Sequence, residues 1–181
     1  MDKKVRERLK KIRLVALDVD GVLTDGQLYF SENGGVYWKA FHVRDGLGFQ
    51  LGKTAGLSFC FLTGRKFPGL YERAKALGVE FVIENTWNKR KPFRELKKKY
   101  GWKEEEIAYI GDDLNDLPVF EEVNVRVAVA NAVKEVKKQA DLVLKAKGGE
   151  GALREFVELV LKAQKRWEQV LKDFSAWLQA E

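Results

Sequence analysis

Short apolar runs alternate along the chain with longer segments in which apolar residues recur at helical spacing. The apolar runs are residues 14–18, 57–62, 79–83, 107–110 and 125–129. Each run is too short for a helix and lacks polar alternation, which is typical of strands buried on both faces. The segments between them predict helices at about 2–13, 45–55, 68–77 and 92–100, and a short one from Leu117. Strands that alternate with helices indicate an α/β, Rossmann-like fold, in which helices cover both faces of one parallel sheet.

Two aromatic-rich stretches interrupt this alternation soon after the first strand. Residues 27–30 and 36–41 flank the sequence Ser-Glu-Asn-Gly-Gly, a composition typical of a protruding β-hairpin over about 27–41. An isolated two-stranded hairpin is only marginally stable in water. We therefore expect its aromatic face to pack against this domain or against another copy of the chain.

The segment of about 151–181 predicts one long amphipathic helix or tail. Apolar residues recur from Leu153 to Leu178 at alternating spacings of three and four, and Gln164 is the polar interruption. At about 1.5 Å per residue, such a helix would reach roughly 40 Å. The pattern leaves open whether the helix folds back on its own domain or reaches a neighbouring subunit.

Length and composition indicate one domain over residues 1–181. The chain is 45% hydrophobic and 33% charged, which is enough to bury a full core, and neither a repeat nor a low-complexity linker divides it. No apolar run approaches the roughly 20 residues that span a bilayer, and residues 1–13 lack the apolar centre of a signal peptide. The lone Cys60 excludes an internal disulfide framework and reads as a small buried hydrophobe. We expect a cytoplasmic protein that does not associate with membranes.

The net charge of +6 is only a weak indication of nucleic-acid binding, because the basic residues are dispersed among acidic ones. The chain has no interleaved aromatic motif or zinc-finger spacing of the kind that marks a nucleic-acid-binding module. We therefore expect no nucleic-acid partner. An anionic substrate explains the excess of positive charge equally well.

Three of the predicted strands are followed directly by polar or charged residues. In chain order these residues are Asp18 and Asp20, then Thr63 and Arg65, then Asp112, Asp113 and Asp116. Because the carboxyl ends of parallel strands meet at one edge of the sheet, we expect these side chains to lie together. Several carboxylates in one crevice repel one another unless a cation intervenes, and oxygen ligands without His or Cys favour Mg²⁺.

Such a site suits phosphoryl transfer. Asp18 could attack phosphorus and form an aspartyl-phosphate, while Asp20 protonates the leaving oxygen and later activates water. Thr63 and a lysine could bind the phosphoryl oxygens and stabilise their charge. Each short motif alone is common in turns. Their joint occurrence in this order, each after an apolar strand, is a much more specific indication of a phosphoryl-transfer site.

These residues resemble the motifs of the haloacid dehalogenase superfamily of phosphohydrolases. Residues 18–24 resemble the first motif, Thr63 the second, Lys89 the third and residues 111–116 the fourth. The resemblance implies that Asp18 is the nucleophile and Asp20 the acid/base, and that Thr63 and Lys89 bind phosphate. Lys91 lies close by and remains an alternative to Lys89.

The same resemblance implies a metal site and a simple architecture. Mg²⁺ would be held by Asp18, the Asp20 carbonyl and Asp112, with Asp113 and Asp116 supporting the metal or Lys89 from behind. Superfamily members usually insert a cap domain after the first or second motif. Here the hairpin alone separates the first motif from the first helix of the sheet, which implies a capless member.

Four further segments, residues 22–26, 41–46, 62–66 and 148–154, resemble the 3-deoxy-D-manno-octulosonate 8-phosphate phosphatases. This family removes phosphate from a sugar acid during lipopolysaccharide biosynthesis. The resemblance implies a homotetramer in which the hairpins assemble and a neighbouring subunit helps to close the active site.

By this resemblance, arginines bind the carboxylate and phosphate of the substrate in bidentate fashion. The implied substrate contacts are Asp20, His42, Val43, Arg44, Asp45, Gly46, Thr63, Gly64, Arg65, Arg73 and Lys89. Gln50 and Glu150 depart from the family pattern, which often has arginine at or near these places, and they leave the exact sugar open.

Two other functions remain open at this point. One is a phosphatase for another sugar or sugar-acid phosphate. The other is a non-catalytic oligomerisation domain, and the intact set of Asp18, Asp20, Thr63 and Asp112 argues against it.

Overall fold

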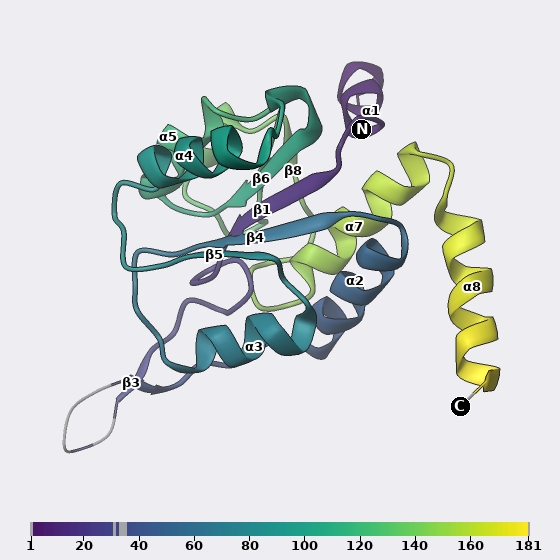
Figure 1. The fold of residues 1–181 in the computed structure, drawn as a ribbon. Helices are drawn as coiled ribbons and strands as arrows, with labels where there is room; N and C mark the ends of the chain where they lie inside the picture. The colour runs from purple at the N-terminus through teal and green to yellow at the C-terminus, as the bar shows by residue number, and fades with distance from the viewer. Residues whose placement is uncertain (1, 31, 33–35, 181) are drawn as a thin grey trace.

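A six-stranded parallel sheet forms the centre of the computed structural model, which describes residues 2–30, 32 and 36–180 (Figure 1). The strand order is β5–β4–β1–β6–β7–β8, and every neighbouring pair is parallel. The strands are β1 (Leu14–Asp18), β4 (Ser58–Leu62), β5 (Phe81–Ile83), β6 (Ile107–Gly111), β7 (Val125–Ala128) and β8 (Leu142–Val143). The predicted α/β fold is thereby confirmed. The two-residue β8 was not predicted, because it is too short to stand out as an apolar run.

Helices cover both faces of this sheet. They are α1 (Lys3–Leu9), α2 (Val43–Thr54), α3 (Gly69–Leu77), α4 (Arg90–Tyr100), α5 (Leu117–Phe120), α6 (Lys134–Gln139), α7 (Ala152–Ala163) and α8 (Trp167–Ala180). Figure 1 shows α4 and α5 on one face and α2, α3 and α7 on the other. None of the helices in the described part of the chain is long and apolar enough to span a membrane.

The central strand β1 is buried along its whole length between β4 and β6. Its continuous apolar run fits this place, because a central strand in a covered parallel sheet has no exposed face. Next to it, Phe49 of α2 packs edge-on against Phe59 and Phe61 of β4, with ring centroids 4.8 and 5.6 Å apart. The buried core therefore fixes the strand that ends in Asp18.

Helix α2 begins two residues earlier than predicted. The reason is His42, whose Nδ1 accepts a hydrogen bond from the Arg44 amide at 3.1 Å and so caps the helix. The cap residues that sequence reasoning looks for first are Ser, Thr, Asp and Asn, and a histidine cap is easily missed.

The single long helix predicted over about 151–181 is wrong, because the chain turns between two helices. Helix α7 ends at Ala163, Lys165 adopts a left-handed backbone with φ of 58°, and α8 starts at Trp167. The Gln164 side chain donates a hydrogen bond to the Ile12 carbonyl at 2.8 Å, which holds the turn against the start of β1. Helix α7 packs along α2, whereas α8 lies outside them at the edge of the molecule (Figure 1).

The predicted hairpin is represented by two short strands. β2 (Tyr29–Phe30) and β3 (Val36–Trp38) pair in antiparallel fashion as a separate two-stranded sheet. They are shorter than the predicted 27–30 and 36–41, and the turn positions 31 and 33–35 lie outside the described residues, so the hairpin as a whole stays a prediction. The aromatic residues Tyr29, Phe30 and Trp38 are 46%, 66% and 72% exposed.

Candidate active site

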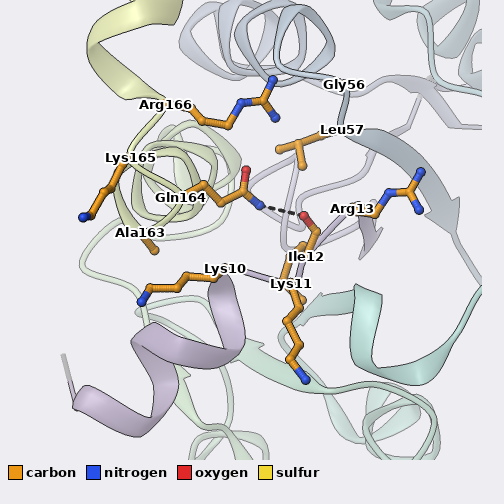
Figure 2. A pocket seen from close by; sticks show the side chains of 10 residues that line it. All are labelled: Lys10, Lys11, Ile12, Arg13, Gly56, Leu57, Ala163, Gln164, Lys165 and Arg166. Atoms are coloured by element: carbon orange, nitrogen blue, oxygen red, sulfur yellow. Dashed lines mark hydrogen bonds between the residues drawn. The ribbon is translucent and has the colours of Figure 1, made fainter.

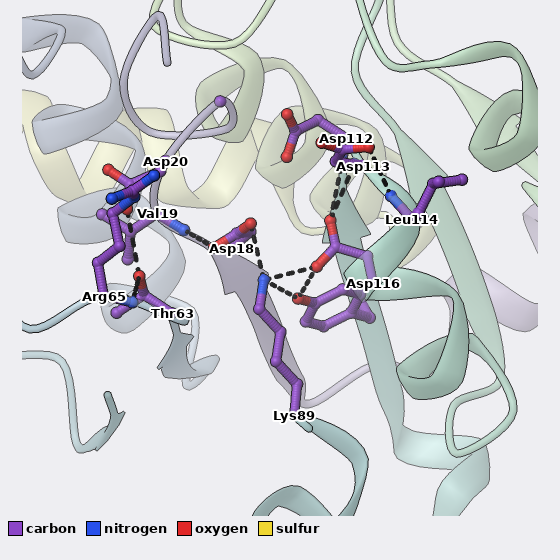
Figure 3. Close-up of polar contacts among 12 residues, drawn as sticks. Asp18, Val19, Asp20, Thr63, Arg65, Lys89, Asp112, Asp113, Leu114 and Asp116 are labelled. Atoms are coloured by element: carbon purple, nitrogen blue, oxygen red, sulfur yellow. Dashed lines mark hydrogen bonds and ion pairs between the residues drawn. The ribbon is translucent and has the colours of Figure 1, made fainter. Parts of the chain in front are cut away.

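The order of the strands brings the predicted functional residues to one edge of the sheet. Asp18 is the last residue of β1, Thr63 follows β4, and Asp112 follows β6. Because β4 and β6 flank β1 on either side, their carboxyl ends meet around Asp18. Figure 3 shows Asp18 in the middle of the group, with Asp20 and Thr63 on one side and Asp112 and Asp116 on the other.

A buried lysine joins two of these carboxylates. Lys89, the residue before α4, lies with its Nζ 2.7 Å from Asp18 Oδ2 and 2.7 Å from Asp116 Oδ1, and its side chain is fully buried (Figure 3). The Tyr109 hydroxyl donates to the same Asp116 oxygen at 2.6 Å, and the Asp112 amide donates to the other Asp116 oxygen at 2.8 Å. Asp116 is therefore fixed from both sides and holds Lys89 against Asp18.

This arrangement bears on the choice between the two candidate lysines. Lys91 lies in the first turn of α4 with its side chain exposed to solvent. Lys89 is the one that the structure places against Asp18. The amide of Asp113 also donates to Asp116, at 3.3 Å.

Burial and mutual repulsion raise the pKa values of carboxyl groups in this site. Burial, together with the charge of Asp116, raises the pKa of Asp18 to about 7 although Lys89 opposes the shift. Burial and the charges of Asp18 and Asp116 raise the pKa of Asp112 to about 8. Burial alone would lower the pKa of Lys89, but the two flanking carboxylates raise it overall. One ammonium is thus insufficient to balance three carboxylates at this place.

The residues present fit a divalent cation. Carboxylate oxygens of Asp18, Asp112 and Asp116 lie within 4.8 Å of one another. Asp112 Oδ1 is buried and, among the described residues, has no hydrogen-bond partner, whereas Asp116 is already engaged by Lys89 and Tyr109. Oxygen ligands without nitrogen or sulfur favour Mg²⁺. Asp18 and Asp112 are the side chains that can hold it, and the part predicted for the Asp20 carbonyl stays a prediction.

Gly21 makes the close approach of Asp112 feasible. Its backbone is left-handed, with φ of +96°, and a Cβ built on it would lie 2.1 Å from Asp112 Oδ2. Any larger residue would collide with the carboxylate and adopt a strained backbone. This is the physical reason for a glycine directly after Asp20.

Both oxygens of Asp20 are held by neighbouring side chains. The Thr63 hydroxyl donates to Asp20 Oδ2 at 3.2 Å and accepts a hydrogen bond from the Arg65 amide at 3.2 Å. The ammonium of Lys39 pairs with Asp20 Oδ1 at 2.5 Å. Sequence reasoning missed Lys39, because it follows an aromatic strand and carries no motif of its own.

A cavity of about 200 Å³ opens onto these groups. The candidate residues that line it are Asp18, Asp20, Thr63, Gly64, Arg65, Asp112 and Asp113. Gly26, Leu28, Trp87 and Asn115 complete the lining, and none of the four was among the predicted site residues. A second cavity of about 420 Å³ shares Leu28, Gly64, Arg65 and Trp87 with the first and extends along Lys66 and Phe67. The two cavities together provide room for a phosphate and for the molecule that carries it.

The remaining candidate substrate contacts, His42, Val43, Arg44, Asp45, Gly46 and Arg73, do not line these two cavities in the described part of the chain. The carboxylate of Asp45 is buried and accepts a hydrogen bond from the Arg154 amide at 2.9 Å, which ties α2 to α7, and burial raises its pKa. The Arg73 guanidinium lies 5.5 Å from the centre of the Phe41 ring. Their roles in substrate binding stay predictions.

A larger cavity, of about 650 Å³, lies at the opposite edge of the sheet (Figure 2). Its lining includes Arg13 and Leu57, which immediately precede β1 and β4, so it faces the amino ends of these strands. Figure 2 shows cationic side chains such as Lys165 and Arg166 around its rim. None of the candidate catalytic residues lines it, and the smaller cavity at the carboxylates is therefore the candidate active site.

The sequence of this chain is similar to those of known hydrolases. The sequence profile of the haloacid dehalogenase-like hydrolases matches residues 81–156. The 3-deoxy-D-manno-octulosonate 8-phosphate phosphatase KdsC of Escherichia coli (strain K12) is 41% identical over 162 residues, which cover 90% of this chain and 86% of that protein. KdsC of Haemophilus influenzae is 42% identical over 160 residues, covering 88% of each.

Solved structures of phosphatases share the fold of this chain. The 3-deoxy-D-manno-octulosonate 8-phosphate phosphatase of Moraxella catarrhalis, in complex with magnesium, phosphate and KDO, superposes with a TM-score of 0.91 at 37% identity, over 96% of this chain and 99% of that one. The cobalt-bound phosphatase of Haemophilus influenzae gives a TM-score of 0.84 at 42% identity, over 88% of this chain and 93% of that one.

The raised pKa values predict how Mg²⁺ and pH together affect stability. The folded pKa values of Asp18 and Asp112, about 7 and about 8, lie above the value of roughly 3.9 for an unfolded chain. At pH values between the unfolded and the folded pKa values, the folded state binds more protons than the unfolded state. These two groups therefore make the metal-free protein less stable as pH rises through this range. A bound cation replaces the protons, and we expect Mg²⁺ to raise the melting temperature more at about pH 8 than at about pH 5.

Differential scanning calorimetry with and without Mg²⁺ at the two pH values measures this difference. Asp112→Asn is the matched variant, and it should remove most of the increment at the higher pH. An equal increment at both pH values would contradict a metal site built on these carboxylates.

Proposed function

Because the chain belongs to the 3-deoxy-D-manno-octulosonate 8-phosphate phosphatases of the haloacid dehalogenase superfamily, we propose that it hydrolyses the phosphate monoester of that sugar acid. The products are the free sugar acid and inorganic phosphate, and the reaction serves lipopolysaccharide biosynthesis. The observation that carries this proposal is the buried contact of Lys89 with Asp18 at the end of β1. It presents a nucleophilic carboxylate beside a cation that can also bind a phosphoryl oxygen.

The first step transfers the phosphoryl group to the enzyme. A carboxylate oxygen of Asp18 attacks phosphorus, and the bond between phosphorus and the sugar oxygen breaks. Asp20 gives a proton to the departing oxygen, which leaves as an alcohol. Lys89 and Thr63 bind the phosphoryl oxygens and stabilise their charge in the transition state. The step leaves an aspartyl-phosphate on Asp18.

The second step returns the enzyme to its starting state. The Asp20 carboxylate, now without its proton, takes a proton from water, which attacks phosphorus and releases inorganic phosphate. Mg²⁺ held by Asp18 and Asp112 would supply positive charge that offsets the charge of the phosphoryl group. Throughout, the hydrogen bonds of Asp116 keep Lys89 next to Asp18.

Specificity for a sugar acid is supported by the second cavity. Its lining includes Arg65 and Lys66, two cations suited to a substrate carboxylate. Gln50 and Glu150 line other cavities, away from the carboxylates. These two departures from the family pattern therefore do not alter the phosphatase site within the described chain, and phosphorylated sugars other than the proposed one are the alternative substrates.

A phosphate-release screen over phosphorylated sugars and sugar acids, with Mg²⁺ present, tests the proposal. We expect 3-deoxy-D-manno-octulosonate 8-phosphate to give the highest kcat/KM. The variant Asp18→Asn should keep the fold but retain less than about 1% of wild-type turnover, because it lacks the nucleophile. No release from any substrate would favour a non-catalytic oligomerisation domain, and substantial turnover by the variant would remove Asp18 from the nucleophile role.

Two lysine variants separate the phosphate-binding lysine from its neighbour. Lys89→Met should lower kcat by roughly 100-fold or more, because the transition state loses a positioned charge, whereas Lys91→Met should stay within about twofold of wild type because surface substitutions perturb little. Steady-state kinetics on both variants, with circular dichroism to verify folding, provides the comparison. A larger loss in Lys91→Met would reverse the assignment.

We also propose that the chain forms a homotetramer through the β2–β3 hairpin. The exposed aromatic side chains of Phe30 and Trp38 support this, because such surface is rarely left uncovered. Sedimentation velocity should show a tetramer for the wild type and smaller species for the double variant Phe30→Ser and Trp38→Ser. Tyr71→Ser, which removes a half-exposed aromatic residue of α3, is the control. A monomeric wild type at working concentration would contradict the proposal.

A further inference from the structure

Lys39 lies just after β3 and sends its side chain into the catalytic edge of the sheet. The side chain is only 3% exposed, and its ammonium pairs with Asp20 Oδ1 at 2.5 Å. The ammonium also lies 5.0 Å from the centre of the Phe67 ring. Taking an ammonium out of water is costly unless a carboxylate compensates it. The contact with Asp20 is therefore a largely buried ion pair that belongs to the structure of this site, unlike an exposed ion pair at the protein surface.

The contact also restrains the orientation of the Asp20 carboxylate. Lys39 donates to Oδ1, and the Thr63 hydroxyl donates to Oδ2. Two partners on two oxygens oppose rotation of the carboxylate more than a single partner does.

We propose that Lys39 is a positioning residue for protonation of the leaving group, acting through Asp20. This inference rests on the acid role of Asp20 in the proposed function. In the first step, the proton passes from the Asp20 carboxyl to the sugar oxygen as the bond from that oxygen to phosphorus breaks. The Lys39 ammonium holds the carboxyl in line and stabilises the negative charge that the carboxyl acquires as the proton leaves.

A second role is conceivable for the same side chain and must be separated by experiment. Lys39 also lines the larger of the two site cavities, beside Arg65 and Lys66. A lysine that only bound the sugar carboxylate would affect substrates that carry this group and leave esters without it nearly unchanged. A lysine that positions the acid affects esters according to how much their leaving oxygen needs a proton.

The test compares two leaving groups. Neither ester carries a carboxylate: the alcohol oxygen of a neutral sugar phosphate needs the proton, whereas the nitrophenolate of p-nitrophenyl phosphate leaves without one. Values of kcat/KM cover substrate binding and the steps up to departure of the leaving group, and they exclude the later hydrolysis of the aspartyl-phosphate. We expect Lys39→Met to lower kcat/KM by roughly 100-fold for the neutral sugar phosphate, the scale of general acid catalysis, and by a much smaller factor for p-nitrophenyl phosphate.

Three further variants make the result decisive. Lys39→Arg keeps a cationic donor and should restore much of the lost activity on the neutral sugar phosphate. Lys66→Met removes a cation from the same cavity, and it should not show the selective loss because neither ester has a carboxylate for it to bind. Asp20→Asn should show the same selectivity as Lys39→Met, because it removes the acid itself.

The outcomes separate the inference from the proposed function. A selective loss in Asp20→Asn together with an equal loss on both esters in Lys39→Met would overturn the role of Lys39 and leave the acid role of Asp20 standing. No selective loss in Asp20→Asn would overturn the acid role itself. Residual turnover of p-nitrophenyl phosphate also reports that Lys39→Met is folded, and Lys39→Gln serves in its place if Lys39→Met does not fold.

Discussion

The buried ammonium of Lys89 between Asp18 and Asp116 is the interaction on which the site depends. A carboxylate at the end of a buried strand loses its hydration, and a second carboxylate close by makes ionisation harder still. Lys89 offsets part of this cost while leaving Asp18 next to the cavity. The remaining negative charge on Asp112 is what a divalent cation compensates. Burial, charge and metal binding are thus parts of one electrostatic balance.

The backbone at the end of β6 leaves room for the Asp116 side chain. Asp116 folds back over the end of β6, where a Cβ on Gly111 would lie 2.5 Å from Asp116 Oδ2. Tyr109, two residues earlier in the same strand, is fully buried and donates its hydroxyl to the other Asp116 oxygen. One strand therefore supplies a hydroxyl, a residue without a side chain and the loop that carries Asp112. The positioning of Lys89 is a consequence of how β6 ends.

Much of this could be predicted from the sequence, because the strands are continuous apolar runs and parallel strands end at one edge. That rule alone placed Asp18, Thr63 and Asp112 together. It could not place Lys39 or Tyr109, since one follows an aromatic strand and the other lies inside a buried strand, and only the tertiary fold brings them to Asp20 and Asp116. The break between α7 and α8 was missed for a similar reason. Gln164 is one polar residue in an apolar seam, and its hydrogen bond to the distant Ile12 carbonyl marks the turn.

In the proposed mechanism, Asp18 itself carries the phosphoryl group during turnover. Acid quenching of the enzyme during steady-state hydrolysis, followed by mass spectrometry of its peptides, tests this most directly. The proposed mechanism predicts the added mass of one phosphoryl group on the peptide that contains Asp18, lost on treatment with hydroxylamine and absent from Asp18→Asn. Phosphorylation at another residue, or an unmodified Asp18 peptide while Asp20→Asn traps no phosphoenzyme either, would contradict it.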